Sequence, residues 1–159
     1  MSKGSFKKVT LTTVATFAAI AVSQMSLAGS NHNHSAHDGI YKERAATMKI
    51  LGGAAKSTGA MLKGETPFDL AKAQAAGQTV ADKAATIPSL FPEGTNAGES
   101  EALPIIWQDW EGFTAAAKLL GERASVLAAA TDQKAAGAAF GGMIKACGGC
   151  HKTYRLDKD

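Results

Sequence analysis

The sequence predicts an all-α protein, an antiparallel four-helix bundle with up-down-up-down topology. Apolar residues recur at steps of three and four in four separate segments, and no useful length of chain alternates with period two as a half-buried strand does. The connections between these segments are mostly short, which makes successive helices antiparallel neighbours. The roughly 130 residues that follow the amino-terminal leader suit a single domain.

The first 28 residues have the anatomy of a secretory signal peptide. Three lysines form a basic start, an apolar run spans residues 9–22, and residues 26–28 (Ser-Leu-Ala) supply a small-x-small cleavage signal. The apolar run is too short and too mild to span a bilayer. We therefore expect cleavage near Ala28 and export of the mature chain, to the periplasm in a Gram-negative host, without stable membrane insertion.

Removal of this leader changes the charge balance. The chain has 17 basic and 14 acidic residues, and the leader holds three lysines and no acid, so 14 of each remain. A small protein with no net charge is a poor candidate for binding nucleic acid or an anionic membrane surface. We expect no nucleic-acid partner.

Residues 29–37 are polar and lack apolar periodicity, so they are expected to form a flexible tail. The tail contains His32, His34 and His37, and histidines so closely spaced can bind a metal ion. A solvated tail with incidental histidines is the alternative, which the composition favours. We assign no metal site to the tail.

The helical bundle is expected to span residues 38–159. Asp38 can cap a first helix over about 39–63, and a second helix opens with Thr66 at the cap and ends before Pro88. Residues 88–100 are rich in proline and glycine and form the one long loop.

The third and fourth helices carry the clearest patterns. The third starts at Pro104 and has a continuous heptad stripe: Ile106, Trp110, Phe113, Ala117, Leu120, Ala124 and Leu127. We interpret Trp107 and Trp110 as packing residues, with Trp110 on the core stripe. Thr131 or Asp132 caps the last helix, where one stripe holds Phe140, Ile144, Cys147, His151 and Tyr154.

The last helix contains the candidate site, the pentapeptide Cys147-Gly-Gly-Cys150-His151. C-x-x-C-H is typical of haem c attachment. The two thiols form thioethers with the haem vinyl groups, and the imidazole becomes the proximal axial ligand of the iron. On a helix these three side chains lie three or four residues apart and project to one side.

Three other chemistries could use a C-x-x-C pair. A redox dithiol normally lies at a helix amino terminus, which lowers its thiolate pKa, whereas this pair falls late in a helical pattern. A zinc site needs about four ligands, and only His32, His34 and His37 could complete one. A disulfide across two residues would close a tiny loop and stabilise little. The motif, its position and the export leader together predict one covalently bound haem c.

Several further segments match a known family. They are Arg44-x-x-x-Met48-Lys49, Lys63-Gly64-Glu65, Pro88-x-Leu90-Phe91-Pro92, Ile106-Trp107-x-x-Trp110-x-x-Phe113 and the carboxyl-terminal haem motif. Through these segments the chain resembles the class II c-type cytochromes, the cytochrome c′ family, over essentially all four helices. Class I cytochromes c carry the haem motif near their beginning. The resemblance implies a haem on the last helix, with the first helix on its distal side.

The resemblance places Met48 at the distal position, four residues after Arg44. In the low-spin branch of the family a methionine here ligates the iron, and the protein carries electrons. In cytochrome c′ proper the distal residue is a non-ligating apolar side chain, and the five-coordinate iron binds small gases. Some five-coordinate members also have methionine at this position, so the residue type does not decide between the two.

The positions of the other methionines favour Met48 as a ligand. Met1 and Met25 leave with the leader, Met143 lies on the haem-bearing helix, and Met61 lies about 20 Å further along the first helix. The start of the first helix adjoins the end of the last in this topology. The alternative is Met48 as a core filler that touches the haem without a bond.

Two arginines are weaker candidates. Arg44 could contact a haem propionate, since a guanidinium forks onto carboxylates, or it could be an exposed surface arginine. Arg155 matches a family position bordering the proximal face, or it is a favourable charge at a helix carboxyl terminus.

Three functions remain at this point. The first is an electron carrier ligated by His151 and Met48, with redox proteins as partners. The second is a five-coordinate cytochrome c′ that binds nitric oxide or carbon monoxide, and the third is a histidine-rich metal-binding module. Catalysis on an organic substrate has no support in the sequence, which lacks a nucleophile motif, a phosphate loop and paired carboxylates. The resemblance also implies a homodimer through the first two helices.

Overall fold

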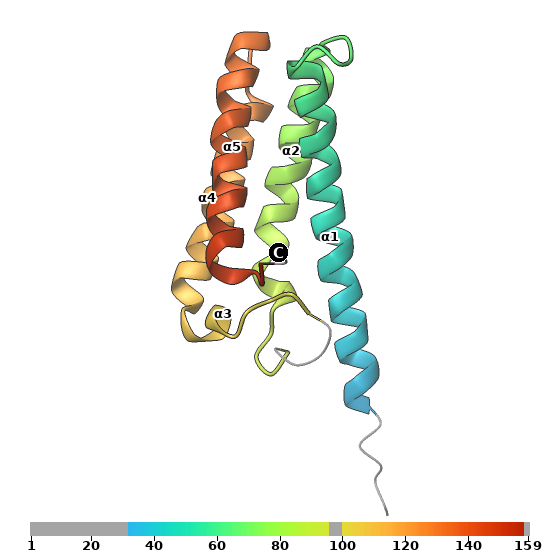
Figure 1. Ribbon diagram of the computed structural model, residues 1–159, viewed down its shortest axis with the longest axis vertical. Coiled ribbons are helices and arrows are strands. Elements are labelled where there is room, and N and C mark those ends of the chain that lie inside the picture. Colours follow the sequence, from blue (N-terminus) through green and yellow to red (C-terminus); the bar gives the residue numbers. More distant parts are fainter. Residues whose placement is uncertain (1–31, 96–99, 158–159) are drawn as a thin grey trace, which may run out of the picture. The chain divides into compact units, whose positions relative to one another are not determined.

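The computed structural model describes residues 32–95 and 100–157, with side chains described from Gly39 onward. Four long helices run alternately up and down as a bundle (Figure 1): α1 (His32–Leu62), α2 (Leu70–Thr86), α4 (Trp110–Ala128) and α5 (Gln133–Tyr154). Two short helices, η1 (Pro88–Leu90) and α3 (Ile105–Gln108), lie between α2 and α4. The predicted all-α four-helix architecture is confirmed.

The first helix starts earlier than expected. α1 begins at His32 instead of near Gly39, so its backbone includes most of the segment predicted to be a flexible tail. The chain turns after Leu62 through Gly64, whose φ of 77° lies in the left-handed region that favours glycine. The side chains of His32, His34 and His37, like the predicted leader, lie outside the described residues.

Aspartates begin α2 and α5. The Asp69 side chain accepts a hydrogen bond from the Lys72 N–H at 3.0 Å, so the second helix is capped at Asp69 and not at Thr66, where we predicted it. Asp132 accepts from the Ala135 N–H at 2.8 Å, which identifies Asp132 and not Thr131 as the cap of α5.

The predicted third helix is interrupted at Asp109, and this corrects the sequence-based expectation. Asp109 leaves the helical conformation (φ −122°, ψ 56°), and its carboxylate accepts from the Gly112 N–H at 3.2 Å, which caps α4. Because the interruption changes the register, Trp110 is 41% exposed and does not lie in the core, while Phe113 is 3% exposed.

Trp107 packs as predicted. Its indole N–H donates to the carbonyl groups of Phe91 at 3.1 Å and Pro92 at 3.0 Å, so it fixes the loop that follows η1. Its ring also lies near the Phe91 ring, with centroids 6.3 Å apart. The side chain therefore joins α3 to the connection before it.

The helices do not pack equally closely. α2 and α4 share the most extensive contact, and α1 and α5 a much smaller one. At Gly77 of α2 an added Cβ would lie 2.8 Å from the Ala124 carbonyl oxygen, so the α2 and α4 backbones approach closely. The looser contact between α1 and α5 leaves room for a cavity. None of the described helices is long and apolar enough to cross a bilayer.

Candidate haem site

A cavity of about 420 Å³ lies between α1 and the end of α5. Arg44 and Met48 of α1 line it together with Cys150 and His151 of α5. Cys147, one turn before His151, is half-buried and packs against the hydrophobic core. Four of the five predicted site residues thus line one cavity, and the fifth lies one helical turn away.

The two thiols are free and half-buried on α5. Burial raises the pKa of the Cys147 thiol. Burial and, to a smaller extent, the neighbouring Cys147 raise the pKa of Cys150. A redox dithiol needs a lowered thiol pKa, so these environments argue against that alternative. Thiols beside an apolar cavity are in contrast well placed for attachment to a macrocycle.

His151 lies near the end of α5, where it lines the cavity and remains partly exposed to solvent. Partial burial lowers the pKa of its imidazole, the positive charge of Arg155 lowers it further, and Glu101 opposes them. The neutral ring is the form that ligates iron, so this environment favours the ligating state. Among the described residues no group of three or more His, Cys, Asp or Glu side chains could hold a metal ion, which gives the zinc alternative no support there.

Met48 reaches the same cavity from α1, where it is half-buried. Its neighbours Thr47 and Leu51 are buried, and Ala45, one turn earlier, lines the cavity while remaining exposed. Met48 is therefore held at the cavity wall by a packed helix. Met143, by comparison, is 1% exposed within the core, and Met61 is 6% exposed.

Aromatic rings form one end of the cavity. Phe113 makes edge-on contacts with Phe91 at 4.9 Å and with Tyr154 at 5.4 Å between ring centroids. All three residues line the cavity. An apolar, aromatic wall suits a flat macrocycle and keeps water away from it, so the residues present fit a haem.

Arg44 is buried, which excludes the exposed surface arginine that we considered. Its Nε donates to the Leu90 carbonyl at 2.6 Å, Nη1 donates to the Thr95 carbonyl at 3.1 Å, and Nη2 donates to the Thr95 hydroxyl. Its guanidinium also lies 4.1 Å from the centroid of the Phe91 ring. Burial lowers the pKa of Arg44, and the phenol of Tyr41 opposes this effect. Arg44 thus ties the loop after η1 to α1, and its propionate contact stays a prediction.

The end of α5 is tied to the segment before α3. Arg155 pairs with Glu101 at 2.8 Å, the Leu103 N–H donates to the Tyr154 carbonyl at 3.0 Å, and the Leu156 N–H donates to the Glu101 carbonyl at 2.7 Å. Arg155 and Glu101 also line the cavity. Sequence reasoning missed Glu101, because no short-range pattern connects residues so far apart in the chain.

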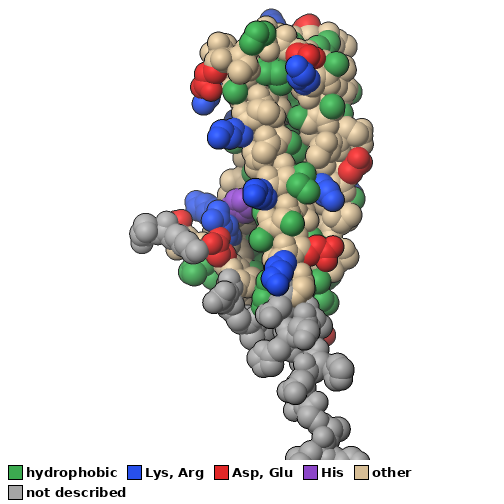
Figure 2. Space-filling model, turned by 90° about the vertical axis from the view of Figure 1, so that its right-hand side faces the viewer, with side chains coloured by type: hydrophobic (Ala, Val, Ile, Leu, Met, Phe, Trp, Pro, Cys, Tyr) green, Lys and Arg blue, Asp and Glu red, His purple; other side chains and the backbone are tan. Residues whose placement is uncertain are grey.

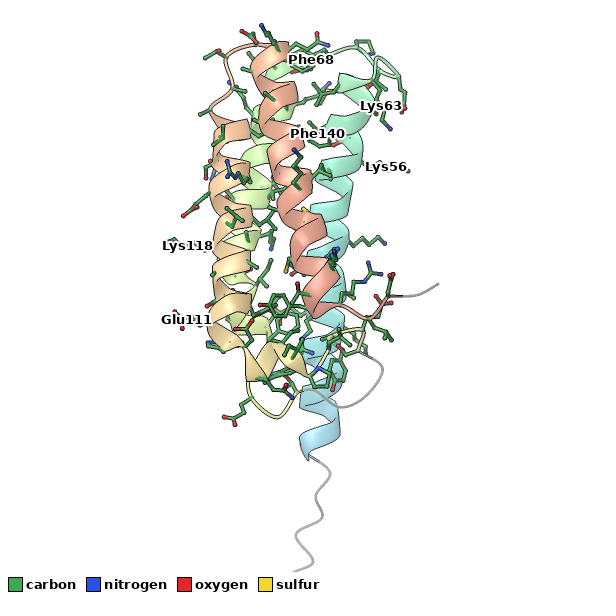
Figure 3. The ribbon with its side chains drawn as sticks, turned by 60° about the vertical axis from the view of Figure 1, so that its left-hand side comes forward. Lys56, Lys63, Phe68, Glu111, Lys118 and Phe140 are labelled. Atoms are coloured by element: carbon green, nitrogen blue, oxygen red, sulfur yellow. The ribbon has the colours of Figure 1, made fainter. Side chains whose placement is uncertain are left out.

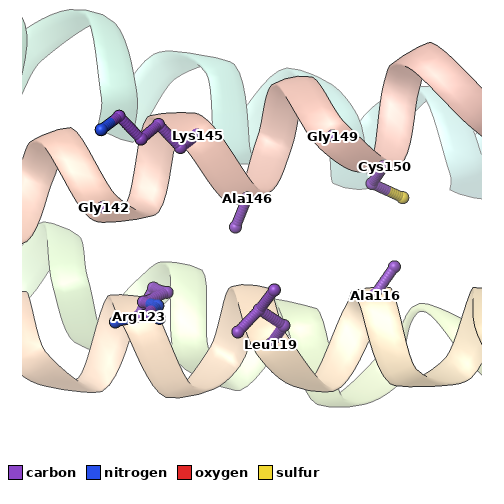
Figure 4. A pocket seen from close by; sticks show the side chains of 8 residues that line it. All are labelled: Ala116, Leu119, Arg123, Gly142, Lys145, Ala146, Gly149 and Cys150. Atoms are coloured by element: carbon purple, nitrogen blue, oxygen red, sulfur yellow. The ribbon is translucent and has the colours of Figure 1, made fainter.

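A second cavity of about 430 Å³ lies in the groove between α4 and α5. Figure 4 shows Cys150 near one end of it and Arg123 with Lys145 toward the other. Leu119 and Ala146 contribute its apolar lining. It contains neither His151 nor Met48, so the cavity between α1 and α5 is the candidate haem site.

The chain matches one protein family over most of its length. The model of the family described as Cytochrome C′ matches residues 39–155. Cytochrome c-556 from Agrobacterium tumefaciens is 41% identical over 122 residues, which cover 76% of this chain and 99% of that protein.

Solved structures give the same result. Cytochrome c′ from Rhodopseudomonas palustris is 34% identical with a TM-score of 0.72, and the match covers 76% of this chain and 98% of that one. A variant of cytochrome c prime from Alcaligenes xylosoxidans, solved as a nitric oxide complex, is 26% identical with a TM-score of 0.70, over 77% and 97% of the two chains.

Proposed function

Because this chain belongs to the cytochrome c′ family, whose members carry covalently attached haem c, we propose that it is an exported single-electron carrier. In this proposal Cys147 and Cys150 hold the haem, His151 is the proximal ligand and Met48 is the distal ligand. Members of the family carry electrons or bind gases and are not typical enzymes.

One observation carries the proposal. Met48 on α1 and His151 on α5 line the same cavity, although they lie at opposite ends of the chain's folded part. The weak packing between α1 and α5 leaves this space, and the aromatic side chains close one end of it. A thioether and an imidazole on separate helices are thus available to one iron.

Haem c, when bound, supplies an iron that cycles between its ferrous and ferric states. The two thioethers would fix the macrocycle to α5, and the neutral His151 ring would donate a nitrogen lone pair. The thioether of Met48 is a soft, neutral ligand that favours reduced iron. α1 packs against α2, and α5 packs against α4, and these contacts hold the side chains in position and keep the rearrangement on electron transfer small.

The alternative is a five-coordinate haem that binds nitric oxide or carbon monoxide. The relative from Alcaligenes xylosoxidans was solved with nitric oxide. Met48 is half-buried beside a cavity whose helices pack loosely against each other, so a small ligand would find space if the sulfur stayed away from the iron. In that case Met48 would only fill space next to the haem.

The cellular setting follows from the leader. We infer export to the periplasm with cleavage near Ala28, which suits thioether attachment outside the cytoplasm. Redox proteins are the expected partners. A homodimer and a contact between Arg44 and a haem propionate are further parts of the proposal.

Acid–acetone extraction tests the attachment. The protein is expressed with its leader in a host that matures c-type cytochromes. Haem should stay with the wild-type polypeptide. The Cys147→Ser/Cys150→Ser variant should either lose its haem to the solvent or contain none. Haem released from the wild type would contradict the attachment. A potentiometric titration of the same sample should then show one reversible one-electron step, and the lack of such a step would contradict electron carriage.

A further inference from the structure

Basic side chains gather on the two helices that flank the haem cavity. α5 carries three lysines and no acidic residue, whereas α4 carries two basic and two acidic residues. The mature chain has no net charge in total. The described side chains of α1 include four basic residues and one acidic residue, Glu43, so the excess of positive charge lies on α1 and α5.

Lysines form a regular row along α1. Lys42, Lys49 and Lys56 follow one another at intervals of seven residues, which places them on one face of the helix, and Lys63 continues the spacing directly after the last residue of α1; all four are exposed. Lys63 pairs with Glu65 at 3.8 Å, an exposed contact of little strength. Within the described part of the chain, Lys42, Lys49 and Lys56 take part in no ion pair.

This row passes the cavity. Ala45 lines the cavity and is exposed, and Lys42 and Lys49 lie three residues before and four residues after it on the same helix face. On α5, the exposed Lys152 follows His151 directly. Figure 2, which looks onto the α1 side of the bundle, shows Lys and Arg side chains spaced along this face.

We propose that this lysine face, defined as Lys42, Lys49, Lys56 and Lys152, is the docking surface for a redox partner protein with an acidic patch. The inference rests on the proposed electron-carrier function. Exposed cations beside a cavity raise the local potential, attract an anionic surface and speed its encounter. A partner bound here would lie next to the cavity that Met48 and His151 line, where the haem would exchange an electron.

The surroundings favour an acidic protein over an anionic membrane. A helix that lies in a membrane surface inserts large apolar side chains beside its cations. On α1 the described part exposes one large apolar side chain, Ile50, and on α5 it exposes Ile144. Ile50 directly follows Lys49 in sequence and so lies on a different side of the helix from the lysine row. The lysine row of α1 therefore offers charge without an apolar anchor on its own side of the helix.

Two double variants test the proposal. Lys42→Gln/Lys49→Gln removes two charges beside the cavity, and Lys83→Gln/Lys118→Gln removes two from α2 and α4. Figure 3 shows Lys118 on α4, away from the row that includes Lys56 on α1. Glutamine has nearly the helix propensity of lysine, so both variants should fold.

The first readout is the oxidation rate of the ferrous protein by ferricyanide, an anion, and by tris(phenanthroline)cobalt(III), a cation. The cavity-side variant should react with ferricyanide at least about threefold more slowly at low ionic strength, with the difference lost in roughly 0.5 M salt. Its reaction with the cobalt complex should be faster. Equal rates for the two variants, in a protein with a normal redox titration, would overturn this inference and leave the electron-carrier function intact.

The second readout needs no electron transfer. Poly-L-glutamate stands in for an acidic protein surface, and its binding is measured by calorimetry. Wild type and the α2/α4 variant should bind it more tightly than the cavity-side variant does. Equal binding by all three proteins would contradict the docking surface. A different outcome would point to a membrane surface and overturn the proposal: wild type and the α2/α4 variant bind phosphatidylglycerol vesicles, and the cavity-side variant does not.

Discussion

The hydroxyl of Tyr154 donates a hydrogen bond of 2.7 Å to Oδ2 of Asp109 and so joins the end of α5 to the start of α4. Oδ1 of the same carboxylate accepts from the Gly112 N–H and caps α4. Tyr154 lies three residues after His151, and its ring lines the cavity. One aspartate thus stabilises a helix start and positions the end of α5 that carries the candidate haem site.

Tyr154→Phe should lower the free energy of unfolding by about 1–2 kcal/mol at neutral pH, because it removes a hydrogen bond to a charged group. The hydrogen bond to Asp109, burial and the Asp109 charge raise the pKa of Tyr154 to about 12, from an ordinary value near 10. A raised acid pKa gives stability that is complete below pH 10 and is lost as the pH rises through 12.

Urea titrations followed by circular dichroism check this prediction. The difference between wild type and Tyr154→Phe should be constant up to about pH 10 and should shrink above it, because the unfolded wild type then ionises its tyrosine. A difference that stays constant to pH 12 would show that the hydroxyl is not held in this way.

Gly112→Ala should be more destabilising than Tyr154→Phe. An added Cβ would lie 2.6 Å from the Tyr154 hydroxyl and also within contact of Oδ2 of Asp109, so it would push apart the two partners. Gly53→Ala on α1 is the matched control, since no atom lies within 4 Å of its added Cβ. The control should gain about 0.5–1 kcal/mol from helix propensity. Similar thermal midpoints for the two variants would contradict the prediction.

Gly77→Ala should cost about 1–3 kcal/mol or more by overpacking the α2–α4 contact. The added Cβ would meet the Ala124 carbonyl oxygen at 2.8 Å and the Ala128 backbone nitrogen at 2.5 Å. Backbone atoms of a helix cannot move aside cheaply, so the helices must separate. Chemical denaturation measures the loss, and a stability at or above that of wild type would show that α2 and α4 lie further apart than described.

Arg44→Met should loosen the loop after η1, because it removes the hydrogen bonds to Leu90 and Thr95. The carbonyl groups left behind are buried, and we expect a loss of about 2–3 kcal/mol. Amide hydrogen exchange should be faster in the variant at Phe91, which is 6% exposed in wild type and whose N–H donates to the Pro88 carbonyl. Arg123→Met, at an exposed position on α4, is the control. Unchanged exchange at Phe91 in the Arg44 variant would contradict the role of Arg44.

The helices and the cysteine pair could be predicted from sequence because their signals are local. Apolar periodicity predicted the segments, with the expected cap at Thr66 and Pro88 marking the ends of the second, and C-x-x-C-H marks the end of α5. The heptad of the third segment led to the wrong prediction at Trp110: it runs through Asp109 without a gap in its spacing, but the Asp109 side chain caps a new helix there. The signal for a new helix start was Asp109 itself, since an aspartate side chain can accept a hydrogen bond from the backbone N–H three residues later, here that of Gly112.

The environment of Arg44 could not be predicted in this way. Its hydrogen-bond partners lie 46 and 51 residues along the chain, on a loop without periodicity. The same holds for Arg155 with Glu101 and for Tyr154 with Asp109, which are 54 and 45 residues apart. Only the packing of α1, α4 and α5 brings these partners together.

The visible spectrum of the reduced protein, before and after carbon monoxide is added, tests the central claim most directly. With His151 and Met48 as ligands, the wild type should be low-spin and nearly unchanged by carbon monoxide. Met48→Leu should be high-spin and bind the gas readily, while Met61→Leu, a matched change further along α1, should resemble wild type. A wild-type protein that is already high-spin and binds carbon monoxide at once would contradict ligation by Met48 and identify a gas-binding haem.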